Sequence, residues 1–340
     1  MLSTGLYLVR RMLYMKREYI FQIARVRSLE NRLFDNQMIA QLVSSGDYDT
    51  CISAVREHGW GGDNSQSMTE EEILKYEIGR TWKDAQELAG ESEVIDVLKT
   101  PQSFHNLKAA VKCAACGYPG GTVFYGNEDS SSLTGDELVR IIQKGEYGRL
   151  PEYMRDCADE AFKSLAHTGN GQMSDAVIDR TCLETMLSKA KSSGSGLAIK
   201  YSELYVAYCD IRIAYRAAAT ARPKDFIMRS VAACEGLDKD KLVSAALGGT
   251  DKVLEYISAV GYLKAAEALK AGSAAFEKLF DDEITELIRP SKYDSFTVGA
   301  IAAYVLARLC EIKNVRIILS GKRNLVSDDV LVERVRMTYV

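Results

Sequence analysis

Hydrophobic positions along the chain recur with the spacing of helices. Tyr19–Phe34 forms one such stretch, with Ile23 and Val26 among its apolar positions, and Thr69–Gly90 forms a longer, charged one. Apolar residues three and four positions apart line one side of a helix. Alternating strand patterns closed by Asn-Gly or Asp-Gly turns are missing. The pattern therefore predicts an all-α fold.

Short stretches rich in Gly, Ser, Asn or Asp interrupt the helical pattern. Such residues favour turns and loops. The clearest breaks are Gly59–Ser65, Gly117–Asn127, His167–Gln172 and Ser192–Gly196. We expect helices to end at these places.

A short pattern recurs twice, each time after 104 residues. The three copies are Asn106-Leu107-Lys108, Asp210-Ile211-Arg212 and Asn314-Val315-Arg316. Apolar residues surround each copy at i, i+3 and i+7: Phe104, Leu107 and Val111; Tyr208, Ile211 and Tyr215; Ile312, Val315 and Leu319. We expect each copy to be a helix with one buried stripe and a basic residue beside it.

A second pattern repeats with the same offset. Leu138, Val139, Gly145 and Leu150 match Leu242, Val243, Gly249 and Leu254, and a looser copy lies at Ile39, Ala40, Gly46 and Cys51. We interpret the chain as three similar helical modules, at residues 1–103, 104–207 and 208–340. Such a module is longer than common solenoid repeats of roughly 20–50 residues and large enough for its own core.

Composition agrees with a large helical protein. The 340 residues are 47% hydrophobic and 26% charged, with five prolines and a net charge of −4. This balance gives no reason to expect a nucleic-acid partner. The longest apolar run, Val298–Cys310, is interrupted by Arg308 and is shorter than the roughly 20 residues that span a bilayer. We therefore expect a cytoplasmic protein without direct bilayer insertion.

Residues for metal or cofactor chemistry do not gather in the sequence. Cys113 and Cys116 form one CxxC, but no second pair follows, and His58, His105 and His167 are far apart. A zinc site needs four ligands at matched spacing. The segment Gly117-Tyr118-Pro119-Gly120-Gly121 lacks the Lys-Ser/Thr of a phosphate-binding loop. We expect reduced, structural cysteines, no metal and no cofactor.

One acidic run offers an enzymatic alternative. Phe280-Asp281-Asp282-Glu283 could hold Mg²⁺ and a diphosphate, as in all-helical prenyl-chain enzymes. No second acidic cluster faces it, and Glu277–Arg289 alternates acids and bases as a solvated helix face does. The three basic residues of the repeat, Lys108, Arg212 and Arg316, are expected to pair with acids between helices or to snorkel.

The two ends of the chain resemble the C-type subunits of the V/A-type ATPases, which are related to the eukaryotic d-type ones. The resemblance rests on Tyr19–Leu33, Ala303–Arg308, Glu311–Ile318, Gly321-Lys322 and Val332–Val335, and it covers about Lys16 to Val340. Met1–Tyr14 precede the usual start, and Leu309 stands where the family often carries an acid. The residues of this signature, interpreted as structural, are Arg25, Arg27, Glu30, Asn106, Lys108, Asp210, Arg212, Glu311, Asn314, Arg316, Gly321 and Lys322.

The resemblance implies a funnel-like protein of three helical modules around a pseudo-threefold axis. It also implies a non-catalytic adaptor between the central-shaft subunits, of D and F type, and the proteolipid ring, on the cytoplasmic face of a membrane that H⁺ or Na⁺ crosses. Two alternatives stay open on the residues: a helical-repeat scaffold of another soluble assembly, and a Mg²⁺-dependent helical enzyme.

Overall fold

The computed structural model describes residues 19–117, 124–125, 133–294 and 296–340, and these are almost entirely helical. Within these ranges no strand forms, and the β-type pairing found is one isolated bridge between Cys234 and Leu237. The prediction of an all-α fold is confirmed. The chain folds as two compact units, of which one combines Met1–Ile95 with Ala271–Val340 and the other is Asp96–Lys270.

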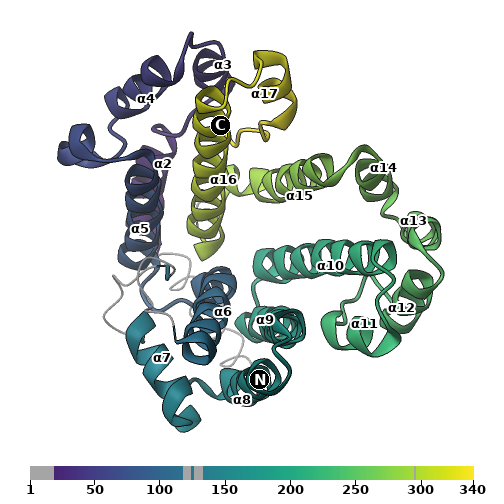
Figure 1. The fold of residues 1–340 in the computed structure, drawn as a ribbon. Helices are drawn as coiled ribbons and strands as arrows, with labels where there is room; N and C mark the ends of the chain where they lie inside the picture. The colour runs from purple at the N-terminus through teal and green to yellow at the C-terminus, as the bar shows by residue number, and fades with distance from the viewer. Residues whose placement is uncertain (1–18, 118–123, 126–132, 295) are drawn as a thin grey trace, which may run out of the picture. The chain divides into compact units, whose positions relative to one another are not determined.

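The first unit combines N-terminal and C-terminal helices of the described chain. Its elements are α2 (Ile20–Glu30), α3 (Asn36–Val43), α4 (Tyr48–Glu57), η1 (Gly62–Ser67), α5 (Glu70–Ala89), α15 (Ser273–Ile288), η4 (Arg289–Tyr293), α16 (Val298–Arg323) and α17 (Asp328–Arg334). Helix α16 runs along α5 and α2 (Figure 1). Its Val315 and Ile318 share one apolar core with Leu42 and Ile73 from the N-terminal helices. This core fixes the C-terminal helix to the N-terminal ones.

Helix α5 shows how local sequence sets an element's ends. The Thr69 hydroxyl accepts a hydrogen bond from the Glu72 N–H, and the Glu72 carboxylate accepts one from the Thr69 N–H, which is a capping box. Gly90 follows the last turn with a φ of +58°, a conformation that suits glycine. The helix expected over Thr69–Gly90 is confirmed.

Helix α2 is shorter than the expected Tyr19–Phe34, because it ends at Glu30. The backbone N–H of Phe34 donates instead to the carboxylate of Glu311, at 3.0 Å. A partner far along the chain therefore replaces the helical hydrogen bond.

The second unit is built on four long helices. Its elements are α6 (Glu93–Cys116), α7 (Gly135–Lys144), η3 (Tyr147–Arg149), α8 (Glu152–Thr168), α9 (Gly171–Ser193), α10 (Gly196–Ala219), α11 (Lys224–Ser230), α12 (Lys239–Leu247), α13 (Thr250–Ala259) and α14 (Leu263–Ala271). Helix α9 packs against both α8 and α10 (Figure 1). Gly169 and Gly194 separate these helices with positive φ, so the breaks expected at His167–Gln172 and Ser192–Gly196 are confirmed.

The other two expected breaks are met in part. Gly59–Ser65 includes the first turn of η1. The break at Gly117–Asn127 falls mostly on residues 118–123 and 126–132, outside the described part of the chain, as does Met1–Tyr14.

The repeat marks lie on three long helices, α6, α10 and α16. Their apolar stripes are buried, except that Tyr215 is half-buried. The first two residues of each copy of the second pattern lie on α3, α7 and α12, and the glycine of each copy follows the end of that helix. Each of these helices is capped four residues before the first residue of the pattern, by Asp35, Thr134 or Asp238, whose side chain accepts from the N–H three residues on. The local structure therefore repeats, while the three-module division and its pseudo-threefold axis stay predictions.

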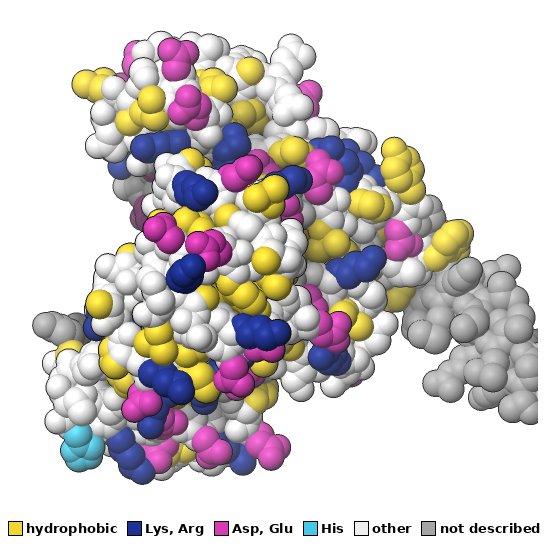
Figure 2. Space-filling model, turned by 90° about the vertical axis from the view of Figure 1, so that its right-hand side faces the viewer, with side chains coloured by type: hydrophobic (Ala, Val, Ile, Leu, Met, Phe, Trp, Pro, Cys, Tyr) yellow, Lys and Arg dark blue, Asp and Glu magenta, His cyan; other side chains and the backbone are white. Residues whose placement is uncertain are grey.

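Two surface properties bear on function. No helix in the described ranges is both long and apolar enough to cross a membrane. On the face shown in Figure 2, acidic and basic side chains are interspersed, and neither sign gathers into one large patch.

Candidate functional site

Two asparagines of the repeat fasten a distant backbone segment to a long helix. The Asn314 side chain accepts from the Arg336 N–H at 2.8 Å and donates to the Arg336 carbonyl at 3.1 Å. Asn106 makes the same two bonds with Tyr125, both at 2.8 Å. In each case one amide satisfies both polar groups of one backbone residue, which leaves no orphaned pair there.

Asp210 occupies the third position and makes half of this contact. Its Oδ1 accepts from the Ala232 N–H at 3.0 Å, while Oδ2 is buried without a hydrogen-bond partner. Burial raises the pKa of Asp210 to about 7, against the lowering effect of that hydrogen bond. The third repeat position therefore also binds a distant backbone N–H, but with a carboxylate in place of an amide.

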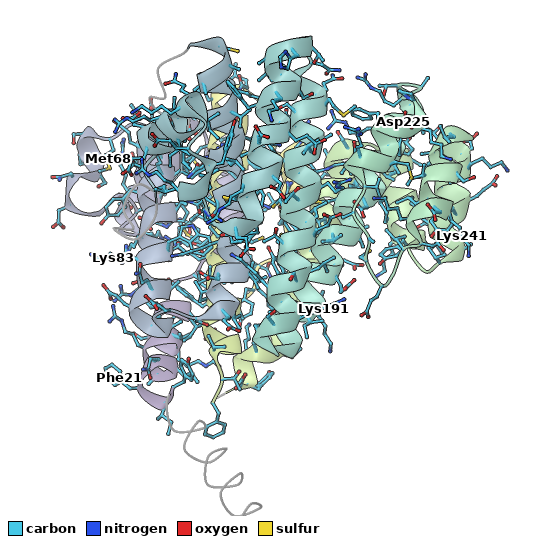
Figure 3. All side chains as sticks on the ribbon, turned by 90° about the horizontal axis from the view of Figure 1, so that it is seen from below. Phe21, Met68, Lys83, Lys191, Asp225 and Lys241 are labelled. Atoms are coloured by element: carbon cyan, nitrogen blue, oxygen red, sulfur yellow. The ribbon has the colours of Figure 1, made fainter. Side chains whose placement is uncertain are left out.

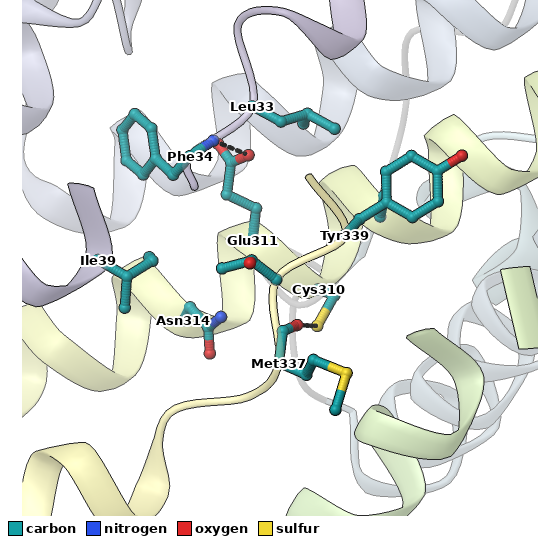
Figure 4. A pocket seen from close by; sticks show the side chains of 10 residues that line it. Leu33, Phe34, Ile39, Cys310, Glu311, Asn314, Met337 and Tyr339 are labelled. Carbon is teal, nitrogen blue, oxygen red and sulfur yellow. Dashed lines mark hydrogen bonds between the residues drawn. The ribbon is translucent and has the colours of Figure 1, made fainter. Parts of the chain in front are cut away.

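The acidic run on α15 holds the C-terminal tail. Asp281 pairs with Lys313 at 2.6 Å and with the Arg336 Nε at 3.0 Å, and Asp282 accepts from the Met337 N–H at 2.7 Å. Figure 4 shows Cys310 beside Met337, whose carbonyl faces the Cys310 thiol at 4.0 Å, and both line a space of about 10 Å³. Among the residues described, no group of three or more His, Cys, Asp or Glu side chains could hold a metal. Asp281 and Asp282 already bind protein groups.

A buried ion cluster joins α5 to α16. The Arg308 guanidinium donates to Glu77 at 2.6 Å and to Glu311, and it lies 4.3 Å from the centre of the Trp60 ring. Glu77 also accepts from the Gly61 N–H at 2.9 Å. Burial raises the pKa of Glu311 to about 7, although Arg308 opposes the shift. The cluster ties the Gly61 loop and two helices together.

Little in the amino-acid pattern points to this cluster. Arg308 stands out only as the charge that interrupts the apolar run Val298–Cys310, and Glu77 is one acid among many on a charged helix. A lone arginine in an apolar helix needs buried partners, so that interruption was the available signal.

A cavity of about 230 Å³ opens beside the cluster, within the first unit. Its polar lining side chains are Arg32, His58, Arg80, Thr81, Asp84, Tyr304 and Arg308. The rest of the wall is formed by Leu29 near the end of α2, Leu33 in the turn after it, Gly59 and Trp60. Burial raises the pKa of Asp84.

The N-terminal signature residues bind neighbouring elements of the first unit. Arg27 contacts the Glu30 carboxylate at 2.7 Å and donates to the carbonyls of Ser291 and Asp294. Arg25 is exposed and pairs with Glu87. A further bond joins the buried Glu30 to the Tyr339 hydroxyl at 3.2 Å. These contacts connect α2 to η4 and to the tail.

The remaining signature residues are also engaged in contacts. Ion pairs join Lys108 to Asp179 and Arg316 to Glu71, while Arg212 contacts the Cys209 sulfur. Lys322 donates to the Ser45 carbonyl and pairs with Asp328. At Gly321 an added Cβ would lie 2.3 Å from the Leu331 side chain, so a larger residue there would displace Leu331 of α17. The structure thus brings Glu311, Asn314, Gly321 and Lys322 together along α16.

Comparison with known proteins places these features in a family. The model of the ATP synthase (C/AC39) subunit family matches residues 22–334. The C-type subunit of the V-type sodium ATPase of Enterococcus hirae is 22% identical over 270 residues, which cover 78% of this chain and 81% of that protein. The family match runs from α2 to α17 and leaves out the tail residues 335–340. The resemblance of the two chain ends is therefore confirmed: the chain belongs to the ATP synthase (C/AC39) subunit family, that of the C-type subunits of V/A-type ATPases.

Proposed function

We propose that the chain is the non-catalytic rotor adaptor of a V/A-type ATPase. Its partners are the central-shaft subunits of D and F type and the proteolipid ring, and it acts on the cytoplasmic face of the membrane during ATP-linked H⁺ or Na⁺ transport. The observation that carries this proposal is the family match over residues 22–334, nearly the whole chain.

The contacts of the first unit support a mechanical role. An adaptor under torque needs a body that does not shear, and close-packed cores resist deformation. Helices α5 and α16 share a core, and Arg308 bridges them through Glu77. The tail beyond α17 is held by Asn314 and Asp282. The N-terminal helices that the structure describes and the C-terminal helices are therefore held in one body.

The two alternatives receive less support. A Mg²⁺-dependent enzyme would need free carboxylates in the run on α15, but Asp281 and Asp282 bind Lys313, Arg336 and a backbone N–H. A scaffold of another assembly would not account for the family match. We therefore keep the adaptor as the function.

A binding experiment with separate arms tests the proposal. The purified chain is mixed with a shaft complex of D- and F-type subunits, with detergent-solubilised ring, and with both. We expect a complex in each arm and a ternary complex in the third, because an adaptor uses two different surfaces. A helical, monodisperse chain that binds neither partner at micromolar concentrations would refute the adaptor.

A further inference from the structure

The cavity beside the buried ion cluster has more basic groups than its own acids neutralise. It lies between the turn after α2, the end of α4, one face of α5 and the first half of α16. Arg32 and Arg80 contribute two guanidinium groups against one lining carboxylate, that of Asp84, while the third arginine, Arg308, is already paired with Glu77 and Glu311. This excess marks the cavity as a place for an anion.

The donors of two of these arginines are available. Arg32 is exposed and has no side-chain hydrogen bond or ion pair to any residue that the structure describes. The nearest carboxylate oxygen to Arg80 belongs to Glu77 and lies 3.9 Å away, which is too long for a hydrogen bond. Arg308, by contrast, is occupied by Glu77 and Glu311. Arg32 and Arg80 therefore approach the space from two elements with their donors uncommitted.

The size of the cavity restricts the ligand. About 230 Å³ lies below the roughly 300–1,000 Å³ of pockets for drug-sized ligands, so a nucleotide is too large. Planar guanidinium forks suit tetrahedral or planar oxyanions, with two parallel N–H donors each. We propose that this cavity binds one compact phosphate-type oxyanion, held by Arg32 from the turn after α2 and Arg80 from α5.

The Asp84 carboxylate repels a bound anion, so removing its charge should change the anion affinity in the direction opposite to removing an arginine. Its side chain is 14% exposed and lies 3.9 Å from Arg25. A carboxylate in the same cavity repels a phosphate, and removing its charge relieves that repulsion. Arg32→Gln and Arg80→Gln should then weaken binding, whereas Asp84→Asn should strengthen it.

Calorimetric titration of the full chain with inorganic phosphate and with pyrophosphate, at constant ionic strength, measures this directly. We expect one site per chain, with affinity about five- to tenfold lower in each arginine variant and higher in Asp84→Asn. Lys83→Gln is the matched control, because Lys83 lies on α5 three residues after Arg80 but points away from the helix into solvent (Figure 3). It should leave the affinity unchanged.

Three results would overturn the proposal. The first is no saturable binding at millimolar phosphate, and the second is equal loss in Lys83→Gln, which would indicate diffuse attraction. The third is binding of an acidic peptide that phosphate does not displace, which would assign the cavity to a protein partner. Arg32 makes no described side-chain hydrogen bond or ion pair, so Arg32→Gln should remain folded. Circular dichroism of the variant checks that its helix content is unchanged. The measurement uses the isolated chain, so its outcome is independent of shaft and ring binding.

Discussion

Asn106 and Asn314 close the same ring of two hydrogen bonds, each with the N–H and carbonyl of a single backbone residue. The partner follows 19 residues later in one case, at Tyr125, and 22 residues later in the other, at Arg336. Asp210, at the third repeat position, binds the N–H of Ala232, also 22 residues later. The repeat thus preserves a backbone anchor, and its chemistry differs at one position.

Replacing Asp210 by Asn should stabilise the second unit near neutral pH. The asparagine Nδ2 could donate to the Ala232 carbonyl, as in the other two copies. The folded pKa of Asp210 is raised from 3.8 to about 7, so the folded state binds the proton more tightly than the unfolded state. Stability of the native protein should therefore fall as pH rises from about 4 to about 7 and level off above.

The Asp210→Asn variant lacks the titrating carboxyl group and therefore loses this pH dependence of stability. The gain in unfolding free energy should grow through that window to on the order of 2–4 kcal/mol at pH 8. Urea titrations from pH 4.5 to 8 measure it, and Asp225→Asn, on the exposed start of α11, is the control. Lys239 and Glu184 also act on the pKa of Asp210, so the measured quantity is the difference between each variant and the native chain at every pH. A difference that does not change with pH would contradict the account.

Asn314→Ala should release the C-terminal tail. It leaves the N–H and carbonyl of Arg336 without their side-chain partner, at a cost of about 1–3 kcal/mol. Hydrogen exchange at Arg336 and Met337 should accelerate while α3 stays protected. Asn324→Ala is a matched control at the end of the same helix, because Asn324 is exposed and donates only to Ser320 within the last turn. Equal effects of the two variants would exclude an anchoring role.

Arg308→Met should be strongly destabilising. It leaves Glu77 and Glu311 buried without their cation, which typically costs about 3–5 kcal/mol. The deficit should grow as pH rises, because the uncompensated carboxyls can be protonated only at low pH. Arg25→Met removes an exposed pair and should cost at most about 1 kcal/mol. Thermal unfolding of both variants at pH 5 and pH 8 tests the difference, and similar losses would mean that the cluster is not structurally important.

Local signals predicted the fold better than long-range ones. The pattern over Thr69–Gly90 predicted α5, and the structure shows that Thr69, Glu72 and Gly90 fix its ends through contacts within one turn. The end of α2 did not follow, because Phe34 bonds to Glu311 across 277 positions of the sequence. Periodicity cannot encode such a partner.

The candidate site was predicted in the same uneven way. The 104-residue repeat located three helices and their buried stripes. It did not show that Asn106 and Asn314 would bind backbone rather than side chains, because the acceptors lie in irregular segments without a sequence signature. The cavity depends on four elements meeting in space, and only the fold brings Arg32 and Arg80 to the lining of one cavity.

As the proposed rotor adaptor, this chain couples shaft rotation to ion movement. The direct measurement is ATP-driven ion uptake per ATP hydrolysed, in vesicles that hold the rotary complex assembled with or without the chain, in Na⁺-containing and Na⁺-free buffer. The account predicts that without the chain hydrolysis continues while uptake falls to background, and that adding it restores uptake. Uptake per ATP that is unchanged in its absence would contradict the account.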